Sequence, residues 1–312
     1  MAVLEQAPPA APAGPRPRAM SAREKWSRRL PLLPALIYTI VVTQVPFLVM
    51  IWYSFQSYFW NEPGGAFFTG VSNYAHVFTD PDFLSAIVRT VTMTVIAVLL
   101  AVIIGTALAM LLDRKFPGRG IVRTLIITPF LVMPAAAALI WQGPMLDPNF
   151  GLLNYLLAPF GVNHEAWLSN HAYGTVIVVM VWQWMPFMML IVLAGLQSQA
   201  GDVLEAAKVD GASAWSTFRE LTIPHLRPYL ELGILLGTIY LVTTFDQIRL
   251  MTQGGPGTQT TTLPYYLYEK VNYAFDIGGS AAAGVVTVVL TIIVASFALR
   301  MFARVFQFEE VR

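Results

Sequence analysis

The residues of this chain that are best suited to bind a ligand are polar and aromatic side chains inside otherwise apolar stretches. They form two groups: Trp182, Gln183 and Trp184 in one stretch, and Tyr240, Thr244, Asp246 and Gln247 in another. Amides, hydroxyls and a carboxylate exchange hydrogen bonds, while indole and phenol rings offer flat faces for stacking. Such groups suit reversible binding of a polar solute, and a polar residue inside a membrane span is a functional candidate.

The same residues also have plain structural explanations. The two tryptophans cannot lie on one helical face, so at least one of them packs against a neighbouring helix or lipid. Asp246 and Arg249 are spaced to pair with each other at i and i+3. The hydroxyls of Thr243 and Thr244 can bond their own backbone or an adjacent helix. The sequence leaves both kinds of explanation open.

Signatures of catalysis are missing from the sequence. It has no Gly-x-x-x-x-Gly-Lys-Ser/Thr phosphate loop, no His-Glu-x-x-His zinc helix and no Gly-x-Ser-x-Gly elbow. It contains no cysteine, which excludes disulfides and thiolate chemistry, and its 4 histidines show no metal-ligand spacing. We therefore expect no enzyme activity, no bound cofactor or metal and no nucleic-acid partner. Energy for any driven process must come from another chain.

The composition indicates a membrane protein. Of the 312 residues, 56% are hydrophobic and 12% are charged, whereas soluble domains carry about 25% charged residues. Six apolar stretches are long enough to cross about 30 Å of hydrocarbon as helices. They lie at 31–55, 87–112, 121–142, 174–196, 229–251 and 281–304. We expect an all-α integral membrane protein with a disordered basic tail at 1–30 and one six-helix domain at 31–312.

The distribution of basic residues predicts the orientation of these helices. Most of the 19 Lys and Arg residues lie in the N-terminal tail, the connections 113–123 and 197–228, and the C-terminal end. The connections on the other side are 56–86, 143–173 and 252–280, and they contain one Lys or Arg residue, Lys270. By the positive-inside rule, both termini and the connection 197–228 are cytoplasmic.

The connection 197–228 contains a polar segment with strong helix-end signals. Asp202 can cap the start of a helix, and Glu205 three residues later completes a capping-box pattern. Gly211 suits a left-handed cap at the other end. The segment therefore predicts a short, well-formed helix on the cytoplasmic side.

A second short helix is expected directly after that glycine. Ser213 can cap it, and it runs from Ala214 to Leu221 because it must end near Pro224. Two short helices joined at a glycine make a compact polar element on an otherwise apolar protein.

This polar element resembles the "EAA" loop of permease subunits in bacterial ATP-binding-cassette (ABC) importers. The matching positions are Glu205, Ala206, Ala207, Asp210, Gly211 and Pro224. The family's usual Leu-Pro ending is Ile223-Pro224 here. The resemblance implies a type I ABC importer permease fold, in which this loop is a coupling helix seated in a cleft of the ATPase subunit.

The residue types agree with that implied role. Small alanines permit close docking, Gly211 allows a sharp turn, and Glu205 offers a carboxylate to a basic partner residue. The alternative is an ordinary amphipathic loop helix whose Glu205 caps its own N-terminus.

A second resemblance concerns the solute. The segments 245–248 and 251–256 resemble the end of the fifth helix in carbohydrate permeases of the maltose type, and 260–266 with 274–275 also fit. Overall similarity is closest to permeases for sugar alcohols such as sorbitol and mannitol. Sugars and polyols present hydroxyls and C–H faces, which suits the amides, hydroxyls and aromatic rings around Asp246.

Together these resemblances imply a subunit that imports a sugar or sugar alcohol by alternating access in the bacterial plasma (inner) membrane. The implied partners are a second permease subunit, two ATPase subunits that bind ATP and Mg²⁺, and an extracytoplasmic solute-binding protein. One alternative is a permease for another small solute. A secondary transporter would need intramembrane acids facing a cavity, for which Asp246 is the strong candidate. An intramembrane enzyme would need clustered His, Asp or Glu residues.

Overall fold

The computed structural model describes residues 30–307, so residues 1–29 of the tail predicted at 1–30 and the last five residues of the chain lie outside the described part. The chain divides into two units inside helix α2 (Leu33–Ser54), between Val49 and Met50. In the first unit, the short 3₁₀ helix η1 (Leu30–Leu32) leads into α2, which contains Pro46. The first apolar stretch is therefore a helix, as predicted.

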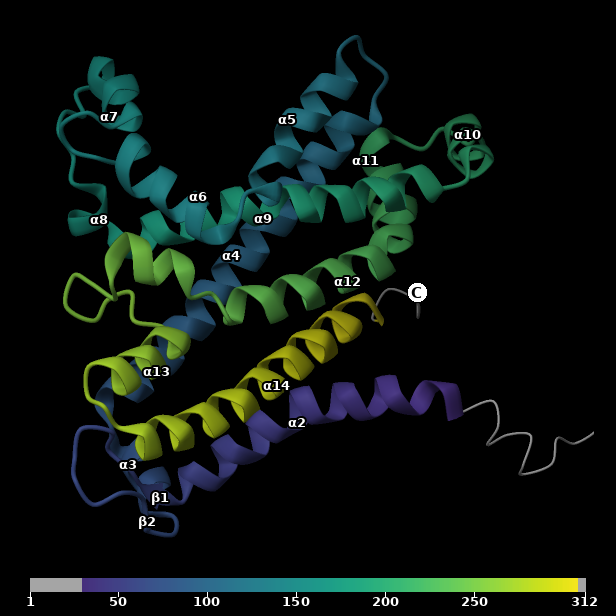
Figure 1. The fold of residues 1–312 in the computed structure, drawn as a ribbon. Helices are drawn as coiled ribbons and strands as arrows, with labels where there is room; N and C mark the ends of the chain where they lie inside the picture. Colours follow the sequence, from purple (N-terminus) through teal and green to yellow (C-terminus); the bar gives the residue numbers. More distant parts are fainter. Residues whose placement is uncertain (1–29, 308–312) are drawn as a thin grey trace, which may run out of the picture. The chain divides into compact units, whose positions relative to one another are not determined.

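The second unit is almost entirely helical (Figure 1). Its first half contains β1 (Gln56–Ser57), β2 (Phe67–Phe68), α3 (Ser72–Thr79), α4 (Pro81–Asp113), α5 (Arg119–Leu131), α6 (Pro134–Ile140), the π-helix η2 (Trp141–Met145), α7 (Leu152–Leu157), η3 (Ala158–Phe160) and α8 (Trp167–Asn170). Its second half contains α9 (Ala172–Ser198), α10 (Gly201–Val209), α11 (Ala214–Thr217), the π-helix η4 (Phe218–Thr222), α12 (Ile223–Val242), the π-helix η5 (Ile248–Thr252), α13 (Leu263–Asn272) and α14 (Ile277–Gln307). The two short strands pair antiparallel, with Gln56 opposite Phe68.

Four helices of the described part are long and apolar enough to cross a bilayer. They are α2, α4, α9 and the segment Ile277–Phe297 of α14. The pair formed by α5 and Pro134–Met145 passes the same test as one broken span, bent by 101°. The structure thus supports four or five spans by length and composition, and a sixth span at α12 stays a prediction.

Two of the predicted spans are interrupted rather than continuous. The stretch 121–142 breaks at Val132 and Met133, between α5 and α6. Pro129 and Pro134 flank this break, and each lacks the N–H that would continue a helical ladder. The stretch 229–251 begins earlier than predicted, at Ile223, and its helix ends at Val242 before η5.

The core of the second unit runs along α4, α9 and α12. Met93, Met180 and Ile234 are buried together in one part of it, and further along the same three helices bury another apolar cluster. Met188 of α9 lies where glycines let the helices approach. A Cβ on Gly105 of α4 would lie 2.7 Å from the Met188 Cβ, and one on Gly237 of α12 would overlap the Met188 methyl. Glycine at both positions therefore permits the close approach of these helices.

Asp80 joins the start of α4 to α13. Its Oδ1 accepts hydrogen bonds from the backbone N–H groups of Asp82 at 2.9 Å and Phe83 at 3.4 Å, which makes it the N-cap of α4. Its Oδ2 accepts from the Tyr266 hydroxyl at 2.7 Å and the Lys270 ammonium at 3.0 Å. One carboxylate therefore fixes two helices.

The same contacts set the charge state of this group. Partial burial alone would raise the pKa of Asp80, but the hydrogen bonds from Tyr266 and Lys270 outweigh it and lower the pKa below its usual value. Burial and the neighbouring carboxylate raise the pKa of Tyr266, which keeps its hydroxyl protonated as the donor.

We expect Asp80→Asn to lower the melting temperature of the purified protein at pH 7. Asparagine still caps α4 but cannot attract Lys270. The lowered pKa means that the ionised carboxylate stabilises the fold above about pH 3.9, and that this contribution is lost as pH falls through the folded-state pKa. The difference between wild type and variant should therefore shrink on acidification, as measured by thermal unfolding in detergent across pH.

Asp80→Ala separates the two roles of the residue. It removes the cap as well, so it should cost a further ~1 kcal/mol at every pH. Equal melting temperatures for wild type and Asp80→Asn at pH 7 would show that the link to α13 contributes nothing.

Candidate functional site

The predicted coupling segment forms a helix, α10, that starts earlier than the sequence suggested. Ala200 occupies the N-cap position, and no side chain caps this end. The prediction that Asp202 is the cap is wrong, because Asp202 lies within the first turn, where its Oδ1 accepts from the backbone N–H of Val203 at 3.0 Å. The alternative role for Glu205 as a cap of its own helix is likewise not present in this structure.

The other end of α10 has the predicted glycine cap. Gly211 has a φ of +82°. Its N–H donates to the carbonyl of Lys208 at 3.2 Å, and the N–H of Ala212 reaches back to Ala207 at 2.9 Å. This pair of bonds is the Schellman arrangement, which needs a left-handed residue between them. A Cβ at Gly211 would meet no atom within 4 Å, so the requirement for glycine is conformational.

The second helix begins as predicted but does not end as predicted. Ser213 caps α11 by accepting from the backbone N–H of Ser216 at 3.1 Å. The expected end near Pro224 is wrong, because α11 continues through η4 directly into α12. The wider π turn precedes Pro224, which then occupies the first turn of α12, where a missing N–H costs little.

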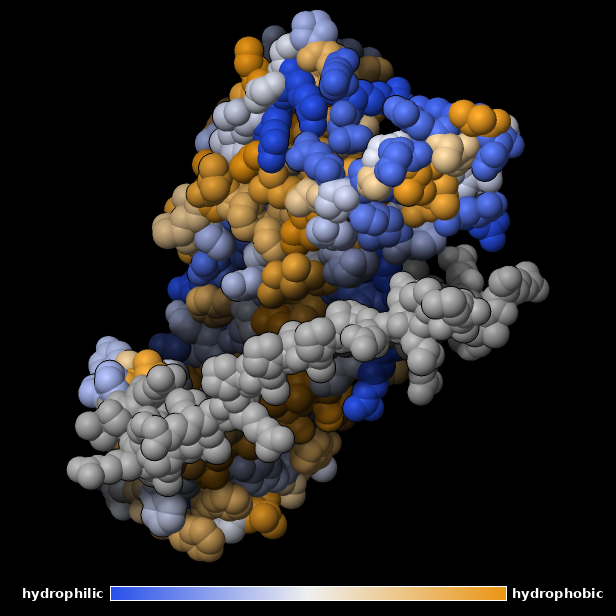
Figure 2. Space-filling view, turned by 90° about the vertical axis from the view of Figure 1, so that its right-hand side faces the viewer, coloured by the Kyte–Doolittle hydropathy of each residue, from blue (hydrophilic) through white to orange (hydrophobic). Residues whose placement is uncertain are grey.

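The surface of this segment combines charge with exposed apolar groups. Glu205, Ala206 and Asp210 are exposed, and Ala207 is half-buried. Val209 is 87% exposed and Trp215 is 70% exposed. Figure 2 shows hydrophilic surface gathered at this end of the second unit, with hydrophobic residues among it. Tryptophan is a residue type enriched where proteins dock, which makes Trp215 a candidate contact for another chain.

Hydrogen bonds that the sequence did not predict join the residue before the segment to residues just after it. The hydroxyl of Ser198, the last residue of α9, lies 3.0 Å from Nε2 of His225 and 2.9 Å from the Tyr229 hydroxyl. The same Nε2 lies 3.0 Å from the carbonyl of Gly195. Residues 199–224 thus leave and re-enter the helical core at one hydrogen-bonded point, here called the clasp.

The predicted solute-binding residues meet at the two helix breaks. Gln183 of α9 is 3% exposed and donates from Nε2 to the carbonyl of Val132, at the break between α5 and α6. The distance is 2.9 Å. Gln247, just after the break that ends α12, is also 3% exposed and donates to Oε1 of Gln183 at 2.7 Å. These amides hold one another and the backbone in this structure.

The two tryptophans beside Gln183 contact opposite arms of the bent span. Trp182 packs edge-on against Trp141 of η2, with ring centroids 5.4 Å apart. Trp184 packs edge-on against Phe130 of α5 at 5.7 Å and stacks on Tyr240 of α12 at 5.1 Å. The expectation that the two rings do not share a face is confirmed. Tyr240 remains 55% exposed, so the Trp184–Tyr240 stack is accessible from one side.

The remaining predicted residues lie at the second break. Asp246 is half-buried, and its proposed ion pair with Arg249 does not occur among the described residues. Arg249 instead lies over the ring of Tyr268, 5.0 Å from its centroid. The Thr243 hydroxyl bonds its own helix, at 2.9 Å from the Tyr240 carbonyl, as the structural alternative anticipated. Thr244 lies in the break itself.

Comparison with known proteins places this arrangement in a family. A profile described as "Binding-protein-dependent transport system inner membrane component" matches residues 97–307, which include α9, the predicted coupling segment and both breaks. The chain belongs to this family.

Relatives of this permease agree with that assignment. It is 38% identical over 266 residues to a probable ABC transporter permease protein, y4oQ, of Sinorhizobium fredii, covering 85% of this chain and 86% of the relative. It is 32% identical to the trehalose/maltose transport system permease protein MalF of Thermococcus litoralis, covering 86% and 91%. A solved bacterial alginate ABC transporter has a chain of the same fold, with a TM-score of 0.76, 21% identity and coverage of 91% and 96%.

Sequence patterns alone do not predict some contacts of the permease, although weak signals for them exist. Val132 lies between Pro129 and Pro134, and this spacing of prolines inside an apolar stretch indicates a broken helix. The need to satisfy the freed carbonyl then points to a buried amide. No comparable signal connects Ser198 to His225.

We expect Gln183→Leu to destabilise the permease more than Gln247→Leu. The first change leaves both the Val132 carbonyl and the Gln247 amide without partners, and an unsatisfied buried group costs about 1–3 kcal/mol. The double variant should cost less than the sum of the two single changes, because neither amide is then left unpaired. Unfolding of the purified protein in detergent measures all three.

Gln197→Leu is the matched control, because Gln197 is an exposed glutamine on the same helix. It should leave stability unchanged. Additive costs in the double variant would contradict the direct coupling of the two amides.

Proposed function

We propose that this permease is the transmembrane subunit of a binding-protein-dependent, ATP-driven importer of a sugar or sugar alcohol. The observation that carries the proposal is the exposed pair of helices joined at Gly211, which occurs in a chain of this family. The 32% identity of this chain to a trehalose/maltose permease supports a polyhydroxylated solute. A sugar alcohol is the more specific proposal, and it rests on the segments around Asp246.

In the proposed topology, six spans cross the bacterial inner membrane and both termini are cytoplasmic. Helix α12 is the additional span, and α5 with α6 and η2 forms a broken one. The basic connections then lie on the side of α10, and α3 and α13 lie outside. The location agrees with the inner membrane named for the family.

The coupling role belongs to Glu205, Ala206, Ala207, Asp210, Gly211 and Pro224. Val209 and Trp215, which are strongly exposed, add an apolar contact for an ATPase subunit. ATP and Mg²⁺ are bound by two such partner subunits rather than by this chain. A second permease subunit and an extracytoplasmic solute-binding protein complete the assembly, which alternates between outward-open and inward-open states.

The solute site is proposed to lie around the accessible Trp184–Tyr240 stack, with Thr244 and Asp246 as polar contacts. Trp182 supports the site through its packing on Trp141. Gln183 and Gln247 bond each other here, so they contact solute only if this pair opens during transport. The alternatives are a different small solute and, less favoured, a secondary transporter, for which α10 would have no docking function.

The double variant Glu205→Ala/Gly211→Pro should abolish solute uptake while the chain still inserts into the membrane. It removes a carboxylate from the docking surface and the left-handed residue that shapes the turn. Uptake by membrane vesicles and the amount of inserted chain are the measurements. Asp202→Ala, an exposed acid on the same helix, should keep uptake, and full uptake by the double variant would refute the coupling role.

Asp246→Ala should reduce uptake of the solute without changing copurification of the ATPase subunits. The carboxylate lost at the break is a hydrogen-bond acceptor for solute hydroxyls. Thr243→Val is the control, because that hydroxyl is bonded within its own helix. Unchanged uptake and solute preference would move the site elsewhere. Solute transport by this chain purified without any ATPase would favour the secondary transporter.

A further inference from the structure

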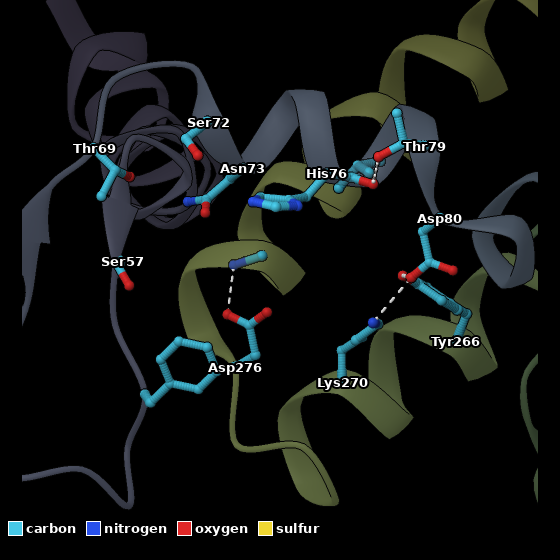
Figure 3. Close-up of a pocket in the computed structure, with 13 residues that line it drawn as sticks. Ser57, Thr69, Ser72, Asn73, His76, Thr79, Asp80, Tyr266, Lys270 and Asp276 are labelled. Atoms are coloured by element: carbon cyan, nitrogen blue, oxygen red, sulfur yellow. Dashed lines mark hydrogen bonds and ion pairs between the residues drawn. The ribbon is translucent and has the colours of Figure 1, made fainter.

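A polar cavity of about 470 Å³ lies in the second unit, away from the predicted solute residues (Figure 3). It is bounded by α3, the segment around β1, the end of α13 and the start of α14. Its polar lining includes Ser57, Asn73, His76, Asp80, Lys270 and Asp276. The volume is within the range of pockets that hold small molecules.

One wall of this cavity is held firmly in place. The Asp80 carboxylate is bonded to both Tyr266 and Lys270, so these three side chains form a connected network. The wall near α14 is equally fixed, because Asp276 accepts from the backbone N–H of Gly279 at 2.7 Å. Asn73 donates to the carbonyls of Ser54 and Gln56 at 2.9 and 2.7 Å. The lining is therefore preorganised for a ligand.

Other polar atoms in the lining have no partner within the described part of the chain. These atoms are the hydroxyls of Ser57 and Ser72, the imidazole of His76, the amide oxygen of Asn73 and Oδ2 of Asp276. They supply both donors and acceptors, and Figure 3 shows Asn73, His76 and Asp276 disposed around the cavity. A hydroxyl group can donate and accept at once, so a hydroxyl-rich ligand matches this mixture.

The charge of the lining and one of its aromatic rings further restrict the class of ligand that the cavity can bind. Lys270 balances Asp80, whereas Asp276 has no ion pair among the described residues. The lining thus carries an excess of negative charge, which disfavours phosphorylated or carboxylated solutes. Phe59 also lines the cavity and offers a ring face for C–H groups. These features favour a neutral sugar or polyol.

The cavity lies at the opposite end of α4 from the basic connection. Asp80 immediately precedes α4, and the basic residues at 114–123 follow its other end. The 33 residues of α4 span about 50 Å, which exceeds the roughly 30 Å of hydrocarbon. The two ends of α4 therefore lie on opposite sides of a membrane that the helix crosses. Because the basic connection is cytoplasmic in the proposed topology, the cavity faces the extracytoplasmic side.

We propose that this cavity is a second solute site, which holds a neutral sugar or polyol at the outer face before the solute enters the membrane. This inference rests on the proposed function and adds a site to it. His76 and Asp276 are its central polar contacts, and Ser57 lies at its wall.

Cysteine protection tests the site, because the chain contains no cysteine of its own. Ser57→Cys is introduced into the complete transporter in membrane vesicles without the solute-binding protein, and its rate of reaction with an impermeant maleimide is measured. Sorbitol, maltose and sn-glycerol 3-phosphate are added separately at about 0.1 M, which fills roughly nine-tenths of a site with a Kd of about 10 mM. Sorbitol or maltose should slow labelling about tenfold, and the phosphate ester should have little effect.

Ser169→Cys, an exposed serine of α8 outside this cavity, is the matched control and should label at an unchanged rate. Adding His76→Ala to Ser57→Cys should remove the protection. Equal slowing at both cysteines, or no protection by either neutral probe, would overturn the site. Equal protection by the phosphate ester would overturn its preference for neutral solutes.

Uptake by the same vesicles, after the binding protein is restored, separates this inference from the proposed function. Normal uptake with no protection at Ser57→Cys rejects the outer site alone. Absence of ATP-driven uptake for every sugar and polyol probe in the cysteine-free protein rejects the proposed importer, and with it the outer site.

Discussion

Two breaks interrupt apolar helices of the second unit, and one pair of amide side chains links them: Gln183 bonds the Val132 carbonyl freed at the first break, and Gln247 reaches it from the second. Gln183 donates to the carbonyl of Val132 and accepts from Gln247, so α5, α9 and the segment that follows α12 are joined by consecutive hydrogen bonds. Inside a bilayer, broken helices persist only where protein or a polar cavity satisfies the freed groups. The positions of the flanking rings follow from this, since Trp182 and Trp184 can reach opposite arms of the bent span only while its break is held against α9.

Helix α9 is consequently the element against which the others are positioned. Its central part carries the amide and the two indoles, while Met188 lies between the glycines of α4 and α12. Tight packing on both sides leaves α9 little freedom to rotate by itself. We expect conformational change in this unit at its breaks, where the helical hydrogen bonds are already interrupted, rather than within the α4–α9–α12 core.

The sequence predicted the features that depend on local chemistry. Residue types alone were enough for the apolar stretches, the glycine turn at Gly211 and the Ser213 cap, because each depends on neighbouring positions. Asp202 was wrongly predicted as the N-cap of α10 because helix ends are set by competition among several weak caps. Pro224 was expected to end a helix, but a π turn accommodated it. The pairing of Gln183 with Gln247, 64 positions apart, depends on packing that no local pattern encodes.

The clasp between Ser198 and His225 has a mechanical consequence. Helical structure is unbroken from Ala214 to Val242, and His225 and Tyr229 tie the beginning of α12 to the end of α9 by hydrogen bonds. The clasp therefore fixes the end of α12 from which α11 projects. A partner that displaces α11 would act on a helical stretch continuous with α12, at an end that hydrogen bonds already hold against α9.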